Sequence, residues 1–242
     1  MRPEERIAAL GFSEADTATL SEHFIDAESR GKLGHGLSRI DWLETLDDLR
    51  PGARPQRVGA EPGYERWDGN GALGYLTLAA VCEAQLADPP AHARVVVASN
   101  CFPTGVLGWY ARRLAEGGLV AALTATSPAR LAHPQGGEPL AGTNPLAIAI
   151  PSSDGKPLVT DVSMGAVTYG DVLRGAASVD ELVPFGGEHA HKAFALALGL
   201  DLLVGALAGL GHGAVLVVAP PEADPVPALR VRAAGLRLPG DS

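Results

Sequence analysis

His35 is the side chain of this sequence best suited to transferring a proton, and it stands between two glycines in residues 31–40, GKLGHGLSRI. Imidazole changes its charge near neutral pH, and flanking glycines leave room for a ligand to approach the ring. Arg39 follows four residues later, and its planar guanidinium suits a substrate carboxylate. The pair indicates a proton donor beside a carboxylate anchor, although a loop histidine and a solvated helix arginine without a catalytic role fit the same pattern.

Two glycine-rich segments further along the chain carry other polar candidates. Residues 136–151, GGEPLAGTNPLAIAIP, combine turn residues with an apolar strand and would present the Thr143 hydroxyl and backbone N–H groups to a ligand, or form an ordinary hairpin loop. Residues 160–171, TDVSMGAVTYGD, place Asp161 and Asp171 ten residues apart, with Gly165 and Gly170 between them. Carboxylates in loops after strands are frequent in active sites, and equally frequent in surface turns.

The sequence gives little support for a metal site or for the common nucleotide-binding motifs. His189 and His191 with Glu188 lack further spaced ligands, and the neighbouring Lys192 points to an anion instead of a metal. Residues 66–74, RWDGNGALG, are predicted to be a turn, and no G-x-G-x-x-G after a strand in a βαβ unit is predicted. Walker and G-x-S-x-G motifs are not found either, so a Rossmann or P-loop enzyme is disfavoured.

Composition indicates an acidic globular protein. The 242 residues carry a formal net charge of −9, and 46% are hydrophobic. No run of Lys or Arg exceeds two residues, which argues against nucleic-acid or anionic-membrane partners. Cys82 and Cys101 lie far apart, as expected in a reducing cytoplasm. The start of the chain lacks a signal-peptide pattern, and the apolar runs are expected to be interrupted before the roughly 18–20 residues of a membrane span.

The elements that must position these residues follow from hydrophobic periodicity and turn signals. Helices are predicted over residues 13–30, 38–50, 75–87, 109–118 and 192–210, and strands over residues 94–99, 119–126, 145–151, 157–163 and 214–220. His35 then lies between two helices. The helix at 192–210 is almost wholly apolar and is expected to be buried on most sides or to lie in a subunit interface.

Several fragments in this order resemble the malate/L-lactate dehydrogenase family of the second, non-Rossmann type. They include AESRGKLGHGLSRI, WDGNGALG, RVVVASNCFPTGVLGWYA, GGEPLAGTNPLAIAIP, PLVTDVSMGAVTYGDV and PFGGEHAHKAFALALGLDLLVGALAG, within residues 20–242. The resemblance implies an α/β fold with a mixed sheet, flanking helices and a small helical N-terminal segment. It also suggests three regions in one compact unit: residues 1–60 with the His35 loop, a core over 61–220, and a tail over 221–242.

The resemblance also assigns roles, with NADPH or NADH as cofactor. It makes His35 the proton donor and Asp171 its relay partner, and it places Arg39, Thr143, Tyr169 and Gly170 at the substrate. The cofactor positions that it implies are Pro103, Thr104, Gly105, Val106, Leu107, Asp161, Val162, Ser163, Lys192 and Arg237. Lys192 would meet a cofactor phosphate, no metal is implied, and a homodimer is expected.

Asp171 in the sequence Tyr-Gly-Asp resembles the branch that reduces Δ1-piperideine-2-carboxylate and Δ1-pyrroline-2-carboxylate, so reduction of a cyclic 2-imino acid is the favoured activity. A malate- or lactate-type 2-hydroxy acid dehydrogenase remains an alternative, as does a catalytically impaired dimeric binding protein. The family's His-Phe pair is replaced by Pro103 and Thr104, and Gly34 replaces the serine that precedes the histidine. On this basis Gly34→Ser is expected to raise imine-reductase activity.

Overall fold

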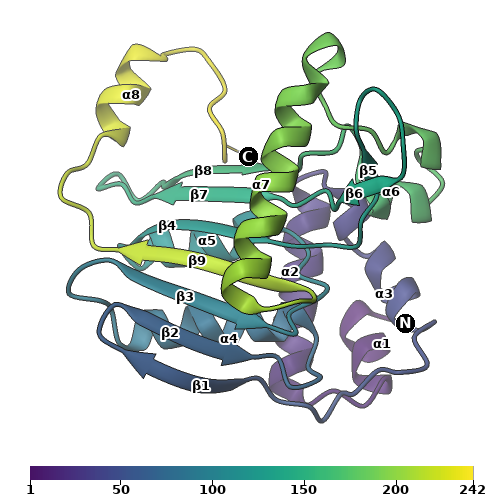
Figure 1. The fold of residues 1–242 in the computed structure, drawn as a ribbon. Coiled ribbons are helices and arrows are strands. Elements are labelled where there is room, and N and C mark those ends of the chain that lie inside the picture. The colour runs from purple at the N-terminus through teal and green to yellow at the C-terminus, as the bar shows by residue number, and fades with distance from the viewer. Residues whose placement is uncertain (242) are drawn as a thin grey trace.

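The computed structural model describes residues 1–241 and centres on one seven-stranded mixed sheet (Figure 1). Its strand order is β1-β2-β3-β9-β4-β7-β8, and every neighbouring pair is antiparallel except β2 and β3. The strands are β1 (Gln56–Glu61), β2 (Tyr64–Asp68), β3 (Arg94–Ser99), β4 (Val120–Ala125), β7 (Leu146–Ile150), β8 (Leu158–Val162) and β9 (Gly213–Ala219). A separate two-stranded ribbon pairs β5 (Leu131–Ala132) with β6 (Pro139–Ala141).

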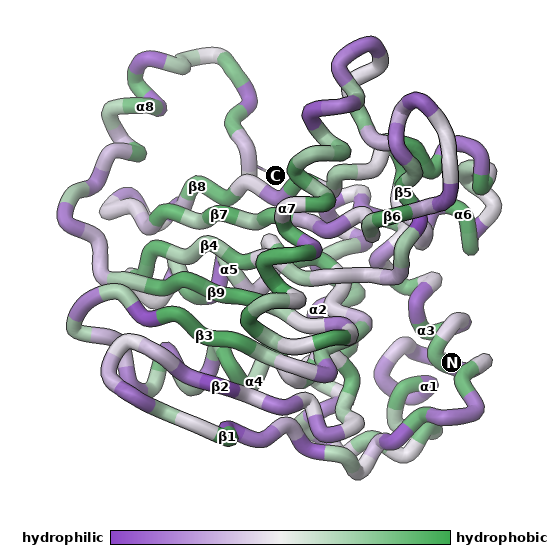
Figure 2. The backbone as a smooth tube through the Cα atoms, viewed as in Figure 1, coloured by the Kyte–Doolittle hydropathy of each residue, from purple (hydrophilic) through white to green (hydrophobic). Residues whose placement is uncertain are grey.

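Helices cover both faces of this sheet. On one face α4 (Gly74–Ala87) and α5 (Leu107–Glu116) build the largest hydrophobic cluster with β3, β4, β7, β8 and β9. On the other face α7 (Ala190–Ala208) packs through Val204 against Val97 and Val215. Figure 2 shows why: β3, β9, β4 and α7 are predominantly hydrophobic along their length, whereas the edge strand β1 and its neighbour β2 carry many hydrophilic residues. The predicted class, a mixed α/β sheet with flanking helices, is confirmed.

A helical N-terminal segment packs at one side of the sheet (Figure 1). It contains α1 (Pro3–Ala9), α2 (Glu14–Ser29), a 3₁₀ turn η1 (Leu33–His35) and α3 (Ser38–Leu43). Ser13 caps α2 by accepting a hydrogen bond from the Asp16 amide at 3.2 Å, as its position before the helix predicts. The second predicted helix is too long, because α3 ends at Leu43. The following turns keep Leu46 and Leu49 against a second hydrophobic cluster, formed mainly by α1, α2 and α3, without helical structure.

The strands from β3 to β9 in the seven-stranded sheet agree with the prediction, but the two strands at the start of the sheet were not predicted. β3 matches residues 94–99, because a β-branched run bounded by turn residues has few alternatives. The hairpin of β1 and β2 was missed, since it is rich in Arg and Glu. Glu65 in β2 is nevertheless 3% exposed and accepts a hydrogen bond from Gln85 at 3.0 Å. Its carboxylate also pairs with Arg94 at 3.2 Å, which satisfies the buried charge.

The remaining helices are short or peripheral. They are α6 (Tyr169–Leu173), the 3₁₀ turns η2 (Val179–Glu181) and η3 (Gly187–His189), and α8 (Val226–Arg232) in the predicted tail. Helix α8 was not predicted. Pro225 and Pro227 do not prevent this helix, because proline is well tolerated in the first turn, where its missing N–H has no partner to lose.

The glycine motif at residues 69–74, GNGALG, corrects the expectation that no G-x-G-x-x-G lies in a βαβ unit. It follows β2 and opens α4, and β2 is parallel to β3. The motif does not make a dinucleotide site, because the chain itself covers it. A Cβ on Gly74 would lie 2.7 Å from the Phe102 amide nitrogen and from the Pro103 carbonyl oxygen. These glycines therefore allow the loop after β3 to pack on the start of α4, and the expected non-Rossmann architecture stands.

Helix α7 is not buried on most sides, which leaves the subunit interface as the remaining one of its two predicted environments. By length and composition, the helical segment of residues 187–208 could cross a membrane, which contradicts the expectation that no apolar stretch is long enough, although core helices of soluble proteins meet the same criterion. Only 28% of the most apolar 18 residues of this segment are buried. The exposed large side chains are Leu196, Leu202, Leu203 and Leu207, with Leu210 just beyond the helix. One face of α7 thus lacks a cover within the described chain.

Candidate active site

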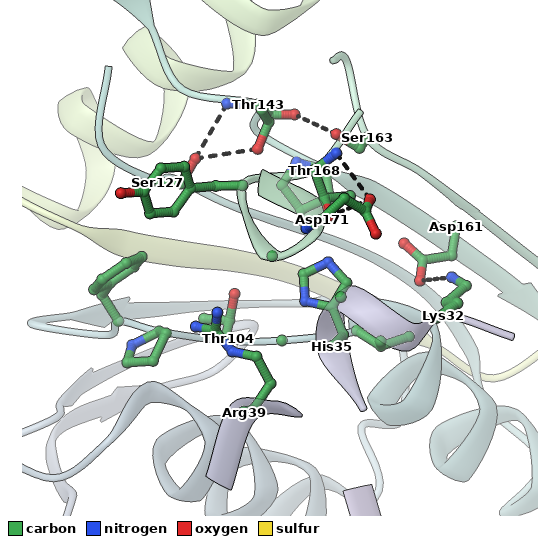
Figure 3. A pocket seen from close by; sticks show the side chains of 18 of the residues that line it. Lys32, His35, Arg39, Thr104, Ser127, Thr143, Asp161, Ser163, Thr168 and Asp171 are labelled. Carbon is green, nitrogen blue, oxygen red and sulfur yellow. Dashed lines mark hydrogen bonds and ion pairs between the residues drawn. The ribbon is translucent and has the colours of Figure 1, made fainter. Parts of the chain in front are cut away.

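A cavity of about 340 Å³ lies where the N-terminal helical segment meets the sheet. Its walls come from six parts of the chain: η1 and the start of α3, the start of α4, the loop after β3, the loop after β4, the Thr-Asn-Pro loop before β7, and the end of β8 with α6 (Figure 3). The predicted site residues that line it are His35, Arg39, Pro103, Thr104, Gly105, Val106, Thr143, Asp161, Ser163, Tyr169, Gly170 and Asp171. Segments more than 130 residues apart in the chain are thus brought to one cavity.

His35 points into this cavity, and Asp161 and Asp171 lie near its imidazole (Figure 3). Burial, followed by the nearby Arg39 guanidinium, lowers the pKa of His35 to about 4, and the carboxylates of Asp161 and Asp171 act in the opposite direction. The ring is therefore neutral near pH 7 in the unliganded protein. Within residues 1–241 no side-chain hydrogen bond fixes it, so both ring nitrogens are available to a ligand.

Arg39 is a buried cation without a counter-ion among the described residues. The side chain is 8% exposed, and its guanidinium carbon lies 4.3 Å from the centroid of the Trp42 ring. Its Nε is buried and has no hydrogen-bond partner. Buried charges in proteins are nearly always paired, so an unpaired guanidinium lining a cavity indicates that an anionic ligand group belongs there.

Asp171 does not contact His35 directly. Its Oδ2 accepts a hydrogen bond from the Thr168 hydroxyl at 2.7 Å, and Oδ1 pairs with Arg174 at 3.1 Å. Burial raises the pKa of Asp171, but the hydrogen bonds from Thr168 and the Arg174 guanidinium outweigh that effect and hold this pKa below its usual range. Asp171 also caps α6 reciprocally with Thr168. The predicted relay to His35 stays a prediction, since the structure shows this carboxylate engaged elsewhere.

Two glycines set the distance between the His35 turn and α6. A Cβ on Gly170 would overlap the carbonyl oxygen of Gly34, and a Cβ on Gly34 would lie 2.8 Å from both the amide nitrogen and Oδ1 of Asp171. The two backbones can approach this closely only without side chains. Gly34 therefore has a steric role, and the interpretation that it merely marks a lost serine hydroxyl misses this contact.

The Thr-Asn-Pro loop forms the opposite wall. The Thr143 amide donates to the Ser127 hydroxyl at 3.1 Å, and the two hydroxyl oxygens lie 3.4 Å apart. Asn144, fully buried, donates to the Ala197 carbonyl and to Asp201 Oδ1 of α7, each at 2.9 Å. Its own Oδ1 accepts from the Ser127 amide at 3.1 Å. Asn144 thereby fixes the position of Thr143 relative to α7.

Asp161 anchors a third wall. Its Oδ2 lies 2.6 Å from the Lys32 ammonium and accepts a hydrogen bond from the Gly108 amide at 3.1 Å. The ion pair joins η1 to the end of β8. The predicted cofactor residue Asp161 is thus at the cavity, but its charge is already balanced within the chain.

The loop Pro103–Val106 lines the cavity from below, and His23 supports it. His23 is 1% exposed, and its Nε2 accepts a hydrogen bond from the Val106 amide at 3.0 Å. Burial, then the charges of His35 and Lys32, lower the pKa of His23 to about 3, so the ring stays neutral. A Cβ on Gly105 would overlap His23 and Tyr75, which explains the glycine at this point.

Four predicted cofactor residues do not line the cavity. Leu107 is fully buried at the start of α5, Val162 is 47% exposed, and Lys192 and Arg237 are exposed elsewhere on the surface. Conversely, the sequence reasoning missed several cavity residues, among them Lys32, Tyr75, Phe102, Ser127, Arg130 and Thr168. Of these residues, only Lys32 and Thr168 lie in glycine-bounded segments from which the sequence could have indicated a site. The others depend on tertiary packing.

A family model described as malate/L-lactate dehydrogenase matches residues 3–178, which include every wall of the cavity. The chain belongs to the malate/L-lactate dehydrogenase family. It is 30% identical to malate dehydrogenase of Pyrococcus horikoshii, with 84% of this chain and 65% of the relative aligned. It is 31% identical to the Δ1-pyrroline-2-carboxylate/Δ1-piperideine-2-carboxylate reductase of Pseudomonas putida, over 84% of this chain and 67% of that protein.

A solved structure of a dehydrogenase from Sinorhizobium meliloti has the same fold. Its TM-score is 0.83 at 23% identity, and the superposition covers 99% of this chain and 86% of the other. The family resemblance inferred from the motifs is confirmed. The chain spans about two thirds of the length of the two family relatives named above, so their activities are a basis for proposals about this chain.

Proposed function

We propose that this protein is an oxidoreductase that reduces C2 of a small 2-oxo or 2-imino carboxylic acid with a nicotinamide cofactor. The observation that carries the proposal is the cavity in which a neutral histidine lies beside a buried arginine that lacks a counter-ion. A histidine and a carboxylate-binding group are the two elements that proton-coupled reduction at C2 of such an acid requires of the protein.

Arg39 would bind the substrate carboxylate. The guanidinium is held flat by the Trp42 ring and is shielded from water, so an ionic hydrogen bond formed there competes little with solvent. Binding at this point orients C2 and the atom doubly bonded to it toward His35. Thr143 was predicted to bind the same carboxylate, but Figure 3 shows Thr143 and Arg39 on opposite sides of the cavity. The Thr143 hydroxyl would therefore meet the other end of the ligand.

His35 would supply the proton. In the reducing direction a protonated imidazole donates to the oxygen or nitrogen of the C2 double bond as that bond becomes single; in the oxidising direction the neutral ring accepts this proton. A substrate anion placed beside the ring favours the protonated form, which counteracts the effect of burial. Asp171 and Asp161 add negative charge on the same side. The two carboxylates would thus support His35 electrostatically.

The cavity fits the reactive end of a nicotinamide cofactor, NADPH or NADH. A volume of about 340 Å³ is at the lower end for ligand pockets, enough for a nicotinamide ring and a small acid, while the rest of a dinucleotide would extend outside. Thr104, Gly105, Val106, Asp161 and Ser163 are the residues that would hold the ring end. When bound, the reduced cofactor supplies the hydride.

The reacting bond can be C=N or C=O. A cyclic 2-imino acid is favoured by Asp171 in its Tyr-Gly-Asp context, and a 2-hydroxy acid dehydrogenase is the alternative. Initial rates with Δ1-pyrroline-2-carboxylate and Δ1-piperideine-2-carboxylate, compared with pyruvate and oxaloacetate and measured with each reduced cofactor, decide between them. Faster turnover of the keto acids would rule out the imine preference. No turnover with any of these substrates and no nicotinamide binding by calorimetry would contradict the proposed activity and favour a binding protein.

Arg39→Met is expected to raise the KM for the acid substrate by about 10- to 100-fold, because a hydrogen bond to a charged group contributes about 1.5–3 kcal/mol. The kcat should fall much less, and the Kd of the cofactor should not change. Steady-state kinetics and calorimetry check this. Arg232→Met, which removes an exposed arginine of α8 outside the cavity, is the matched control. An unchanged KM in Arg39→Met would show that the carboxylate binds elsewhere.

We also propose a cytoplasmic homodimer that buries the exposed face of α7. The large apolar side chains Leu196, Leu202, Leu203 and Leu207 are all exposed on α7, and monomers rarely leave large apolar patches in water. Sedimentation velocity should show a dimer, and Leu202→Glu with Leu203→Glu should give a folded monomer. A wild-type monomer at micromolar concentration would contradict this arrangement. The two buried free thiols, Cys82 and Cys101, agree with a reducing compartment.

A further inference from the structure

Arg130 lines the cavity and belongs to no site assigned so far. It lies in the loop after β4, and its backbone amide donates to the Ala141 carbonyl at 2.8 Å. Ala141 precedes Thr143 by two residues, so the Arg130 backbone belongs to the wall of Ser127 and Thr143. Figure 3 shows Ser127 and Thr143 across the cavity from Arg39. The guanidinium carbon stacks 3.3 Å from the centroid of the Tyr169 ring, which fixes the plane of the group.

The charges around the cavity do not balance without a ligand. Lys32 pairs with Asp161, and Asp171 pairs with Arg174. Arg39 and Arg130 are the two lining cations that form no ion pair within residues 1–241. His35 is neutral here and cannot pair with either. The cavity therefore presents two separate unpaired guanidinium groups, and one substrate carboxylate at Arg39 leaves the second group unmatched.

We propose that Arg130 is a specificity-determining residue that binds a second anionic group at the far end of the substrate. The ligand class is a 2-oxo or 2-imino acid whose side chain carries another carboxylate or an equivalent oxyanion, so that the substrate spans from Arg39 to Arg130 past His35. This inference rests on the proposed function and holds for either reacting bond. The names of the relatives leave it open, because malate carries two acid groups and pyrroline-2-carboxylate carries one.

The stacked geometry suits this role. A guanidinium held against an aromatic ring keeps its N–H edge free for a planar oxyanion and loses little conformational freedom on binding. The hydroxyls of Ser127 and Thr143 on the same wall can donate to the same anion. A substrate without the second group leaves this N–H edge unpaired in the complex. The resulting loss of affinity is larger than that caused by losing a contact to an apolar wall.

The test uses pairs of reaction products that differ only in the second carboxylate: L-lactate against L-malate, and L-proline against pyrrolidine-2,5-dicarboxylate. Calorimetry on the full chain with saturating oxidised cofactor measures each Kd. For at least one pair the diacid should bind tighter than the monoacid by about tenfold or more. Arg130→Met should reduce that preference to nearly one while leaving the Kd of the monoacid almost unchanged, and Arg130→Lys should retain part of it. Arg232→Met should behave as wild type.

The other outcomes are equally decisive. Equal affinity for both members of each pair in the wild type, or an unchanged preference in Arg130→Met, overturns the inference and leaves the proposed function intact. A weaker Kd for the cofactor in Arg130→Met, with the diacid preference unchanged, shows that this guanidinium binds a cofactor phosphate and also overturns it. No binding of any acid while cofactor binds contradicts the proposed function itself.

Discussion

Replacing His35 with glutamine is expected to lower kcat for reduction by about 10²- to 10⁴-fold, the usual contribution of a positioned proton donor. Glutamine keeps hydrogen-bonding capacity near the same place but cannot carry a proton to the substrate. The Kd of the cofactor should hardly change, because the walls that would hold it come from other segments. Stopped-flow single-turnover rates with calorimetry of both ligands measure the two effects separately.

The pH dependence makes this expectation specific. Burial lowers the pKa of His35 to about 4, so in the free protein the protonated fraction falls about tenfold for each pH unit above that value. The kcat/KM for reduction should therefore rise as the pH is lowered toward 4, whereas kcat/KM for oxidation should be flat above about pH 5. His92→Gln, at an exposed position outside the cavity, is the control. If His35→Gln kept the wild-type rate and profile, another group would be the proton donor.

Gly34→Ser is expected to lower both stability and activity, the opposite of what the family pattern alone suggests. The new Cβ would lie 2.8 Å from the amide nitrogen and Oδ1 of Asp171, and both belong to the capped first turn of α6. Neither can retreat without breaking the hydrogen bonds of that turn. Overpacking of this kind costs about 1–3 kcal/mol, and separating η1 from α6 would displace the imidazole from the substrate.

Urea denaturation measures the free energy of unfolding of Gly34→Ser, and steady-state kinetics measure kcat/KM. Gly52→Ser is a suitable control, because a Cβ at Gly52 meets no atom within 4 Å and its backbone is not left-handed. A stable Gly34→Ser protein with raised activity would mean that α6 moves away from η1 in the working state. That result would support a chemical role for the serine hydroxyl beside His35 and would contradict the steric role of Gly34.

Local patterns were sufficient where a residue's role depends on its own neighbours in the chain. His35 and Arg39 lie four residues apart in the consecutive elements η1 and α3, so their joint presence at a cavity was predictable from spacing. Strand β3 was recognised because its β-branched run permits little else. The polar hairpin of β1 and β2 was not, since the partners that justify burying Glu65 lie 20 and 29 residues further on, at Gln85 and Arg94.

The roles of residues whose partners lie far away in the chain could not be predicted from the sequence. The role of Asn144 depends on Asp201, which is 57 residues away, and the position of Arg130 depends on stacking over Tyr169. The role of Gly34 was inferred from the chemistry of the serine that it replaces, whereas in the structure it is determined by the close approach of Gly170. In each case the missing information is which backbones approach each other, and hydrophobic periodicity does not encode it.

The hydrogen bonds of Asn144 have a thermodynamic consequence for the whole molecule. Because its amide holds the Thr143 loop and α7 in one register, a ligand that immobilises Thr143 also restricts α7, and a neighbour that packs on α7 restricts Thr143. Such couplings are reciprocal. Substrate affinity and the self-association proposed for α7 are then thermodynamically coupled. Each bound substrate would strengthen association, and dissociation of the dimer on dilution would weaken substrate binding at each site by the same factor.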